Sequence, residues 1–143
     1  MKSKTPLTLM ELLIMILIFS LTAALCVQLF VAADRWSREN EQKDRAILSV
    51  QNTAEILKYA GGDLEEASNL LGGTVSGAQW TLLFDEEGQV IAQKEKAVYD
   101  VLVEVTDSGH QLLGTALVTA RRTTDQKELF CITAAWQEVE RDE

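Results

Sequence analysis

Apolar residues divide the chain into three stretches, and the first of them is almost uninterrupted. From Leu12 to Ala33 it has no charged residue, and its polar residues are Ser20, Thr22 and Gln28. About 20 apolar residues in a helix cover the roughly 30 Å hydrocarbon core of a bilayer. A cleaved secretory signal has a shorter apolar core, whereas apolar character continues here to Val31. The stretch is therefore predicted to be a membrane-spanning helix.

The second stretch, residues 34–62, is polar but keeps a helical periodicity. Its apolar residues recur at intervals of three and four, at Ile47, Val50, Ala54 and Leu57. Such a stripe marks one face of a helix that packs on something. We expect the membrane helix to continue through this stretch and to end at the pair Gly61-Gly62. The stripe is short, so packing on the chain's own sheet is favoured over a coiled-coil partner.

The third stretch, residues 63–143, begins with a short helix and continues with strands. Asp63 is the predicted N-cap of that helix, and Glu66 follows at the position of a capping box. Five strand-like runs then follow, separated by turn-like sequences: Gln79 to Phe84, Gln89 to Gln93, Val98 to Thr106, Gln111 to Thr123, and Glu128 to Gln137. Apolar residues alternate with polar ones along them, which predicts an antiparallel meander with one buried face.

The three stretches together predict an α+β fold class. A long N-terminal α-helix, with a membrane-spanning first half, would pack its second half on a C-terminal antiparallel β-meander. The length of 143 residues accommodates one domain and a membrane segment.

The charge is distributed unevenly and bears on partners and orientation. The formal net charge is -9, of which residues 1–33 account for +1 and residues 34–143 for -10. An acidic outer part argues against a nucleic-acid partner, because phosphate binding needs a basic face. Lys2 and Lys4 precede the apolar run, and the positive-inside tendency then favours a cytoplasmic N-terminus and an extracytoplasmic C-terminal domain.

Residues that carry catalytic or metal chemistry are few. His110 is the single histidine, and there is no glycine-rich phosphate loop, nucleophile elbow or Cys-x-x-Cys pair. We therefore expect no enzyme activity, no cofactor and no metal. Cys26 and Cys131 fall in different environments, so no disulfide is expected. The acidic turn 85–87 is interpreted as a solvated hairpin tip rather than a calcium site, and Arg121-Arg122 as an exposed strand end rather than the partner of an acid.

The N-terminal residues carry a more specific pattern. Residues 2–14 read KSKTPLTLMELLI: a short basic leader, a break at Pro6, an apolar residue, Thr8-Leu9, one more residue, and then Glu11. This pattern resembles the prepilin leader and cleavage region of type IV pilins and type II secretion pseudopilins. The resemblance covers about the first 33 residues.

The resemblance implies a role for each matching residue. A prepilin peptidase would cut between Pro6 and Leu7, the new N-terminal amine of Leu7 would be methylated, and Glu11, behind Thr8-Leu9, would be the assembly glutamate. In a filament the buried amine of one subunit and the Glu11 carboxylate of a neighbour would compensate each other's charge. The family usually has glycine before the cut, and Pro6, which restricts the backbone there, is expected to lower the efficiency of processing.

The implied organisation has four parts. They are a leader at 1–6, a transmembrane and assembly helix at 7–33, the outer half of that helix at 34–62, and an extracytoplasmic pilin-like domain at 63–143. The implied function is a structural subunit of a type IV pilus, competence or type II secretion-like filament. Pro6 and the lack of a disulfide-closed terminal loop favour a minor pilin or pseudopilin. The implied partners are the membrane, the prepilin peptidase, other pilin-like subunits and the assembly platform.

Two alternatives stay open. The chain is otherwise interpreted as an uncleaved, signal-anchored extracytoplasmic binding module, because Pro6 departs from the family pattern. Trp36, just after the apolar run, suits either the membrane–water interface or a contact between subunits.

Overall fold

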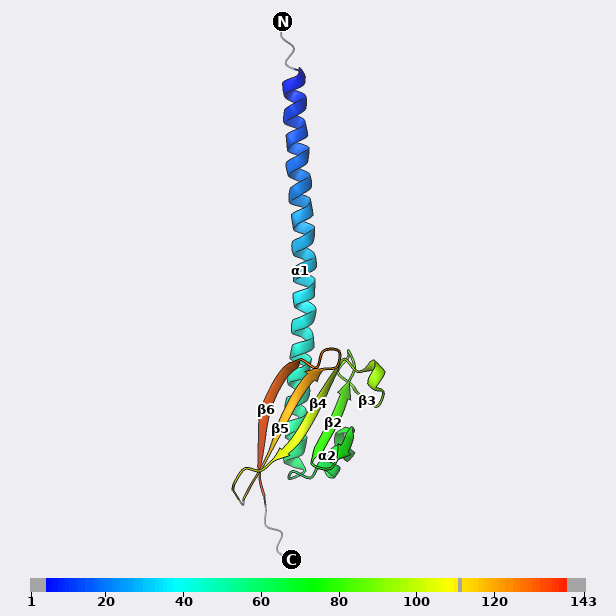
Figure 1. Cartoon of the computed structure of the whole chain (residues 1–143), viewed down its shortest axis with the longest axis vertical. Coiled ribbons are helices and arrows are strands. Elements are labelled where there is room, and N and C mark those ends of the chain that lie inside the picture. Colours follow the sequence, from blue (N-terminus) through cyan, green and yellow to red (C-terminus); the bar gives the residue numbers. More distant parts are fainter. Residues whose placement is uncertain (1–4, 111, 139–143) are drawn as a thin grey trace, which may run out of the picture. The chain divides into compact units, whose positions relative to one another are not determined.

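The computed structural model describes residues 5–110 and 112–138 (Figure 1). Its elements are α1 (Thr5–Tyr59), α2 (Leu64–Leu71), β1 (Thr74–Ser76), β2 (Gln79–Phe84), β3 (Val90–Ile91), the 3-10 helix η1 (Lys94–Lys96), β4 (Tyr99–Thr106), β5 (Leu113–Arg122) and β6 (Glu128–Gln137). The α+β class, with a long N-terminal helix and a C-terminal antiparallel sheet, is confirmed. The chain divides into two compact units between Asn40 and Glu41, and each is described by itself. Lys2 and Lys4 of the predicted leader lie outside the described residues.

The end of α1 follows the prediction from the glycine pair. Gly61 and Gly62 have φ angles of 61° and 86°, a region that favours glycine. The N–H of Gly61 donates to the carbonyl of Lys58 at 3.0 Å, and the N–H of Gly62 donates to that of Leu57 at 2.9 Å. This is the Schellman pattern, which satisfies carbonyls that the end of a helix leaves without partners.

Asp63 caps α2, but the predicted capping box is only half formed. The Asp63 carboxylate accepts from the backbone N–H groups of Glu65 and Glu66 at 2.9 and 3.2 Å. In a full capping box the Glu66 side chain would also accept from the backbone N–H of Asp63. That hydrogen bond is absent from the described contacts, because the N–H of Asp63 already donates to the carbonyl of Ala60 at 3.1 Å. The turn that closes α1 therefore replaces the second half of the box.

The strands form one antiparallel sheet in the order β1-β2-β4-β5-β6, and β3 also pairs with β2. β2 and β6 have the predicted bounds, and β4 and β5 lie within theirs, apart from Gln111, which is outside the described residues. The run predicted at 89–93 was too long, since β3 covers only Val90–Ile91. The short elements β1 and η1 were not predicted.

The predicted packing of the outer part of α1 on the chain's own sheet is confirmed. Its buried residues are Ala46, Val50, Thr53, Ala54 and Leu57. The apolar ones among them share one core with Trp80, Val101 and Val118 of the sheet. Ile47, placed in the stripe from its spacing, is only half buried. The series 46, 50, 53, 54 and 57 follows one face of the helix more closely, which puts Ile47 at its margin.

Arg121 is not an exposed strand end, so that prediction was wrong. The register of β4 and β5 places Arg121 directly opposite Asp100. Their side chains form an ion pair at 2.8 Å, and Asp100 is 6% exposed. Arg122 also has an acidic partner, Asp125, at 3.4 Å. The pairing depends on the register between two strands, which alternation within a single strand does not specify.

Trp136 on β6 packs between two glycines that are distant in the sequence. A methyl group built on Gly62 would lie 2.3 Å from atoms of the indole ring, and a methyl group built on Gly114 would lie equally close. Trp136 as a whole is 7% exposed. Because neither glycine has a side chain, the indole can fill the space between the end of α1 and β5.

Candidate functional site

The residues of the predicted processing and assembly motif all lie on α1. Pro6, Leu7, Thr8, Leu9 and Glu11 are exposed. Leu7 and Glu11 are four residues apart, and so they share one face of the helix. Pro6 is the second residue of α1, in the first turn, where a missing N–H costs little because those groups have no partner inside the helix. The start of the helix therefore includes the predicted cleavage position.

The apolar part of α1 has the length and composition of a membrane span. It contains an 18-residue window that is long and apolar enough to cross a membrane, and none of that window is buried. Large apolar side chains such as Leu13, Phe19 and Phe30 are all more than half exposed. A helix that is apolar all round finds a favourable environment in lipid or among other helices, and not in water.

The polar residues of this segment fall into two groups. Ser20 and Thr22 donate their hydroxyls to the carbonyls of Ile16 and Ile18, each at 2.8 Å. Such bonds satisfy the hydroxyls inside the helix, as an apolar surrounding requires. Glu11 and Gln28 differ, because neither side chain forms a hydrogen bond or ion pair with any other residue that the structure describes. Their polar groups remain available to another molecule.

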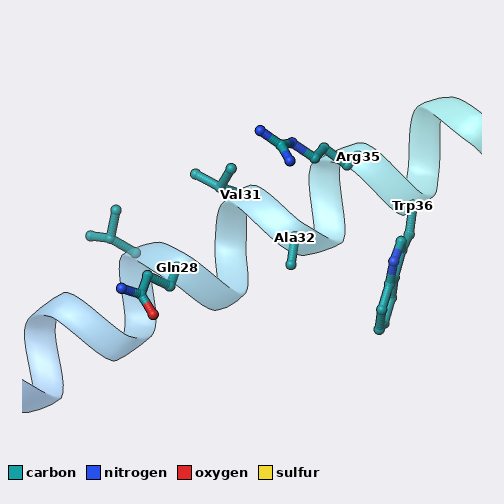
Figure 2. A pocket seen from close by; sticks show the side chains of 6 residues that line it. Gln28, Val31, Ala32, Arg35 and Trp36 are labelled. Carbon is teal, nitrogen blue, oxygen red and sulfur yellow. The ribbon is translucent and has the colours of Figure 1, made fainter.

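A groove lies near the end of the apolar segment, and sequence reasoning did not find it. It has a volume of about 410 Å³ and is lined by Val27, Gln28, Val31, Ala32, Arg35 and Trp36. Figure 2 shows Val31 and Arg35 projecting from one side of α1 and Trp36 from the other. Ala32, with its small side chain, lies between Gln28 and Trp36 on the helix surface and leaves the space open.

Arg35 is distinguished from the neighbouring arginines by its lack of an acidic partner. Arg38 pairs with Asp34 at 3.0 Å, and Arg45 pairs with Glu41 at 2.7 Å. No such pair is formed by Arg35 with any residue in the described ranges, including Glu39 one turn further on. The groove is thus lined on one side by an arginine without an acidic partner in the described residues, and on the other by the indole of Trp36, which is 71% exposed (Figure 2).

In the second of the two compact units, Glu41–Glu143, which is called the outer unit below, the polar contacts serve the fold. The Tyr99 phenol shares a 2.9 Å hydrogen bond with Ser49, and burial raises the pKa of Tyr99. Arg45 donates to the carbonyl of Glu86 at 2.7 Å, which ties the acidic turn to α1, and its hydrogen bond with Glu41 raises the pKa of Arg45. These contacts link α1 to the sheet.

The other candidate residues do not gather into a site. His110 is exposed in the turn between β4 and β5. Cys26 and Cys131 are free thiols in different units. Across residues 5–110 and 112–138, no three histidine, cysteine or acidic side chains are arranged to hold a metal ion.

The candidate functional site is therefore the exposed apolar part of α1, with Glu11 near its start and the Trp36 groove near its end. Comparison of the chain with protein-family models, with curated proteins and with solved structures finds no match.

Proposed function

We propose that this chain is a pilin-like structural subunit, a minor pilin or pseudopilin, of a type IV pilus, competence or type II secretion-like filament. The observation that carries the proposal is Glu11, an exposed carboxylate without a partner in the described residues, on a helix of membrane length and four residues after Leu7. The basic leader, Thr8-Leu9 and Glu11 together form the pattern of a prepilin processing region.

In this function the apolar part of α1 holds the precursor in the cell membrane as a single span. The N-terminus is cytoplasmic, and the sheet domain is extracytoplasmic. A prepilin peptidase cuts between Pro6 and Leu7, and the new amine of Leu7 is methylated. The subunit then leaves the bilayer for a filament, where other apolar helices replace the lipid around α1. An assembly platform and other pilin-like subunits are the partners of this step.

Glu11 gives this assembly its register. A carboxylate costs about 2.5 to 3.5 kcal/mol at the centre of a membrane helix on insertion scales and less toward its ends, where Glu11 lies. Among the packed apolar helices of a filament, Glu11 is tolerated best where a cation meets it. The freed amine of Leu7 on a neighbouring subunit supplies that cation. Each charge alone is costly in apolar surroundings, whereas the pair is compensated. A shift of one subunit along the other separates the two charges, and therefore the pair selects one arrangement.

Pro6 supports a second candidate, an uncleaved signal-anchored binding module. Proline restricts the backbone around the bond to be cut, at a position where the family usually has glycine. In that function the same helix anchors the chain permanently, and the sheet domain binds a ligand or partner outside the cell. Glu11 then has no role in assembly.

The two functions are separated by neutralising Glu11 without changing its shape. We expect Glu11→Gln to insert into the membrane at the level of the unmodified chain but to fall roughly tenfold or more in sheared filaments, since a charge-assisted pair contributes about 1.5 to 3 kcal/mol. Glu39→Gln, an exposed acid beyond the apolar run, is the matched control and should assemble normally. Equal filament levels of Glu11→Gln and the unmodified chain would count against the assembly role.

A further inference from the structure

The groove beside Trp36 combines three chemically different surfaces within three turns of α1. Val27 and Val31 provide an apolar wall that continues the apolar segment, and Arg35 follows on the same side of the helix. Gln28 and Trp36 border the recess above Ala32 on the other side (Figure 2). The guanidinium of Arg35 and the indole N–H of Trp36 are donors only, and the Gln28 amide offers both a donor and an acceptor.

The position of the Arg35 guanidinium defines what this groove can accept. Figure 2 shows the side chain of Arg35 extending back along the helix toward Val31, that is, toward the apolar segment. Along the helix axis, Val31 lies only three residues, or about 4.5 Å, from Gln28. Side chains on an α-helix lean toward its N-terminus, and here this lean brings the Arg35 guanidinium to the edge of the apolar segment, within reach of an anion that lies at the edge of an apolar phase.

We propose that this groove binds an anionic phospholipid, with its phosphate on Arg35, an ester carbonyl on the Gln28 amide, and an acyl chain that passes Val27 toward the apolar segment. Arginine matches phosphate oxygens with two parallel N–H donors, and the ester carbonyls of a phospholipid lie just below its phosphate, on the hydrocarbon side. Trp36 lies at the headgroup level, which suits an indole with one apolar and one polar edge.

Charge complementarity favours an anionic lipid over a zwitterionic one. The groove contains one positive charge and no carboxylate, so that a lipid with a net negative headgroup neutralises it. A zwitterionic lipid brings its own ammonium group, which competes with Arg35 for the phosphate. A second copy of this chain brings acids such as Asp34 and Glu39 on its own α1 as well as apolar side chains, so it is the competing occupant that the test must separate from a lipid.

The inference rests on the proposed placement of α1 in a membrane but not on filament assembly. It is tested on the full chain alone, reconstituted in phosphatidylcholine vesicles with a minor fraction of phosphatidylglycerol. The measured quantity is the fluorescence of Trp36, which a bromine atom on a neighbouring acyl chain quenches. In one sample the bromine is carried by the acyl chains of phosphatidylglycerol, and in the other by those of phosphatidylcholine. Trp36 is the exposed tryptophan, whereas Trp80 and Trp136 are buried in the outer unit, and a Trp36→Phe sample provides their background.

We expect phosphatidylglycerol to quench Trp36 more, molecule for molecule, than phosphatidylcholine. Arg35→Gln should reduce this preference roughly fivefold, the factor that corresponds to about 1 kcal/mol for one cation at an anionic surface. Arg38→Gln is the matched control. It removes the same charge about one turn further along α1, and Arg38, unlike Arg35, pairs with Asp34. It should leave the preference unchanged, and Arg35→Lys should retain only part of it.

Several results would overturn the inference, and each has a distinct meaning. An equal loss for Arg35→Gln and Arg38→Gln would show diffuse attraction to the surface and no site at the groove. If the quenching of Trp36 by both brominated lipids decreased as the protein density in the vesicles rose, another helix would fill the groove. No quenching by either lipid would instead contradict the membrane placement of α1, and with it the proposed function.

Discussion

The contact of Trp136 with two glycines makes a quantitative test of how the outer unit is held together. The test replaces Gly61, Gly62 and Gly114 by alanine, one at a time. Gly61→Ala adds a methyl group with nothing within 4 Å, but at a φ of 61°. Gly114→Ala adds a methyl group at an ordinary φ, but 2.3 Å from the indole. Gly62→Ala combines both problems, with a φ of 86° and the same close approach.

The three variants separate backbone strain from steric overlap. A left-handed conformation costs a residue with a Cβ roughly 1 to 2 kcal/mol, which is the expected loss of unfolding free energy for Gly61→Ala. Overpacking typically costs about 1 to 3 kcal/mol, which is the expected loss for Gly114→Ala. Gly62→Ala should therefore lose about 2 to 5 kcal/mol. The Gly62→Ala/Gly114→Ala double variant should lose less than the sum, because once the ring of Trp136 has moved, it no longer meets the second methyl group.

The measurement is urea denaturation of the full chain in detergent micelles, followed by the fluorescence of the buried Trp80 and Trp136. The predicted order of stability is the unmodified chain, then Gly61→Ala and Gly114→Ala, then Gly62→Ala. If Gly114→Ala were as stable as the unmodified chain, or if the losses of the double variant were additive, Trp136 would not occupy the space between the two glycines.

Three further predictions concern pH, charge and processing. Burial raises the pKa of Tyr99 above its ordinary value of 10.0, so the unfolded chain loses the phenol proton at a lower pH than the folded chain does. The free energy of unfolding should therefore fall as pH rises above that value. Urea titrations of Tyr99→Phe at the same pH values should lack this part of the fall. Arg121→Ala leaves the buried Asp100 without its cation and should lower the unfolding free energy by about 2 kcal/mol, whereas no loss would show that the pair is dispensable. Pro6→Gly should raise the ratio of mature to precursor chain on immunoblots, and an unchanged ratio would show that Pro6 does not limit processing.

The parts of the fold that local sequence pattern determines could be predicted. The end of α1 at its two glycines, the N-cap at Asp63 and the strands β2 and β6 each depend on residue types or alternation within a few positions. The strand β1 has only three residues, Thr74–Ser76, too few to show a period. The pairing of Asp100 with Arg121 was missed because it depends on the register between two strands, which turns and long-range packing set.

The candidate site was predicted at one end and missed at the other. The processing residues and Glu11 follow one another in the sequence, so their pattern is visible without a structure. The groove consists of two rows with a spacing of four residues, Val27-Val31-Arg35 and Gln28-Ala32-Trp36. Writing the segment on a helical projection would have placed Arg35 beside Trp36, but not shown that Arg38 is paired and Arg35 is not. That difference depends on side-chain conformation.

The mass of the N-terminal peptide of the native protein tests the central claim most directly. If the chain is a pilin-like subunit, the peptide begins at Leu7 and carries a methyl group on its amine. A native protein whose first peptide still contains Met1, or begins at Lys2, would contradict the proposed processing and leave an uncleaved membrane anchor as the function of α1.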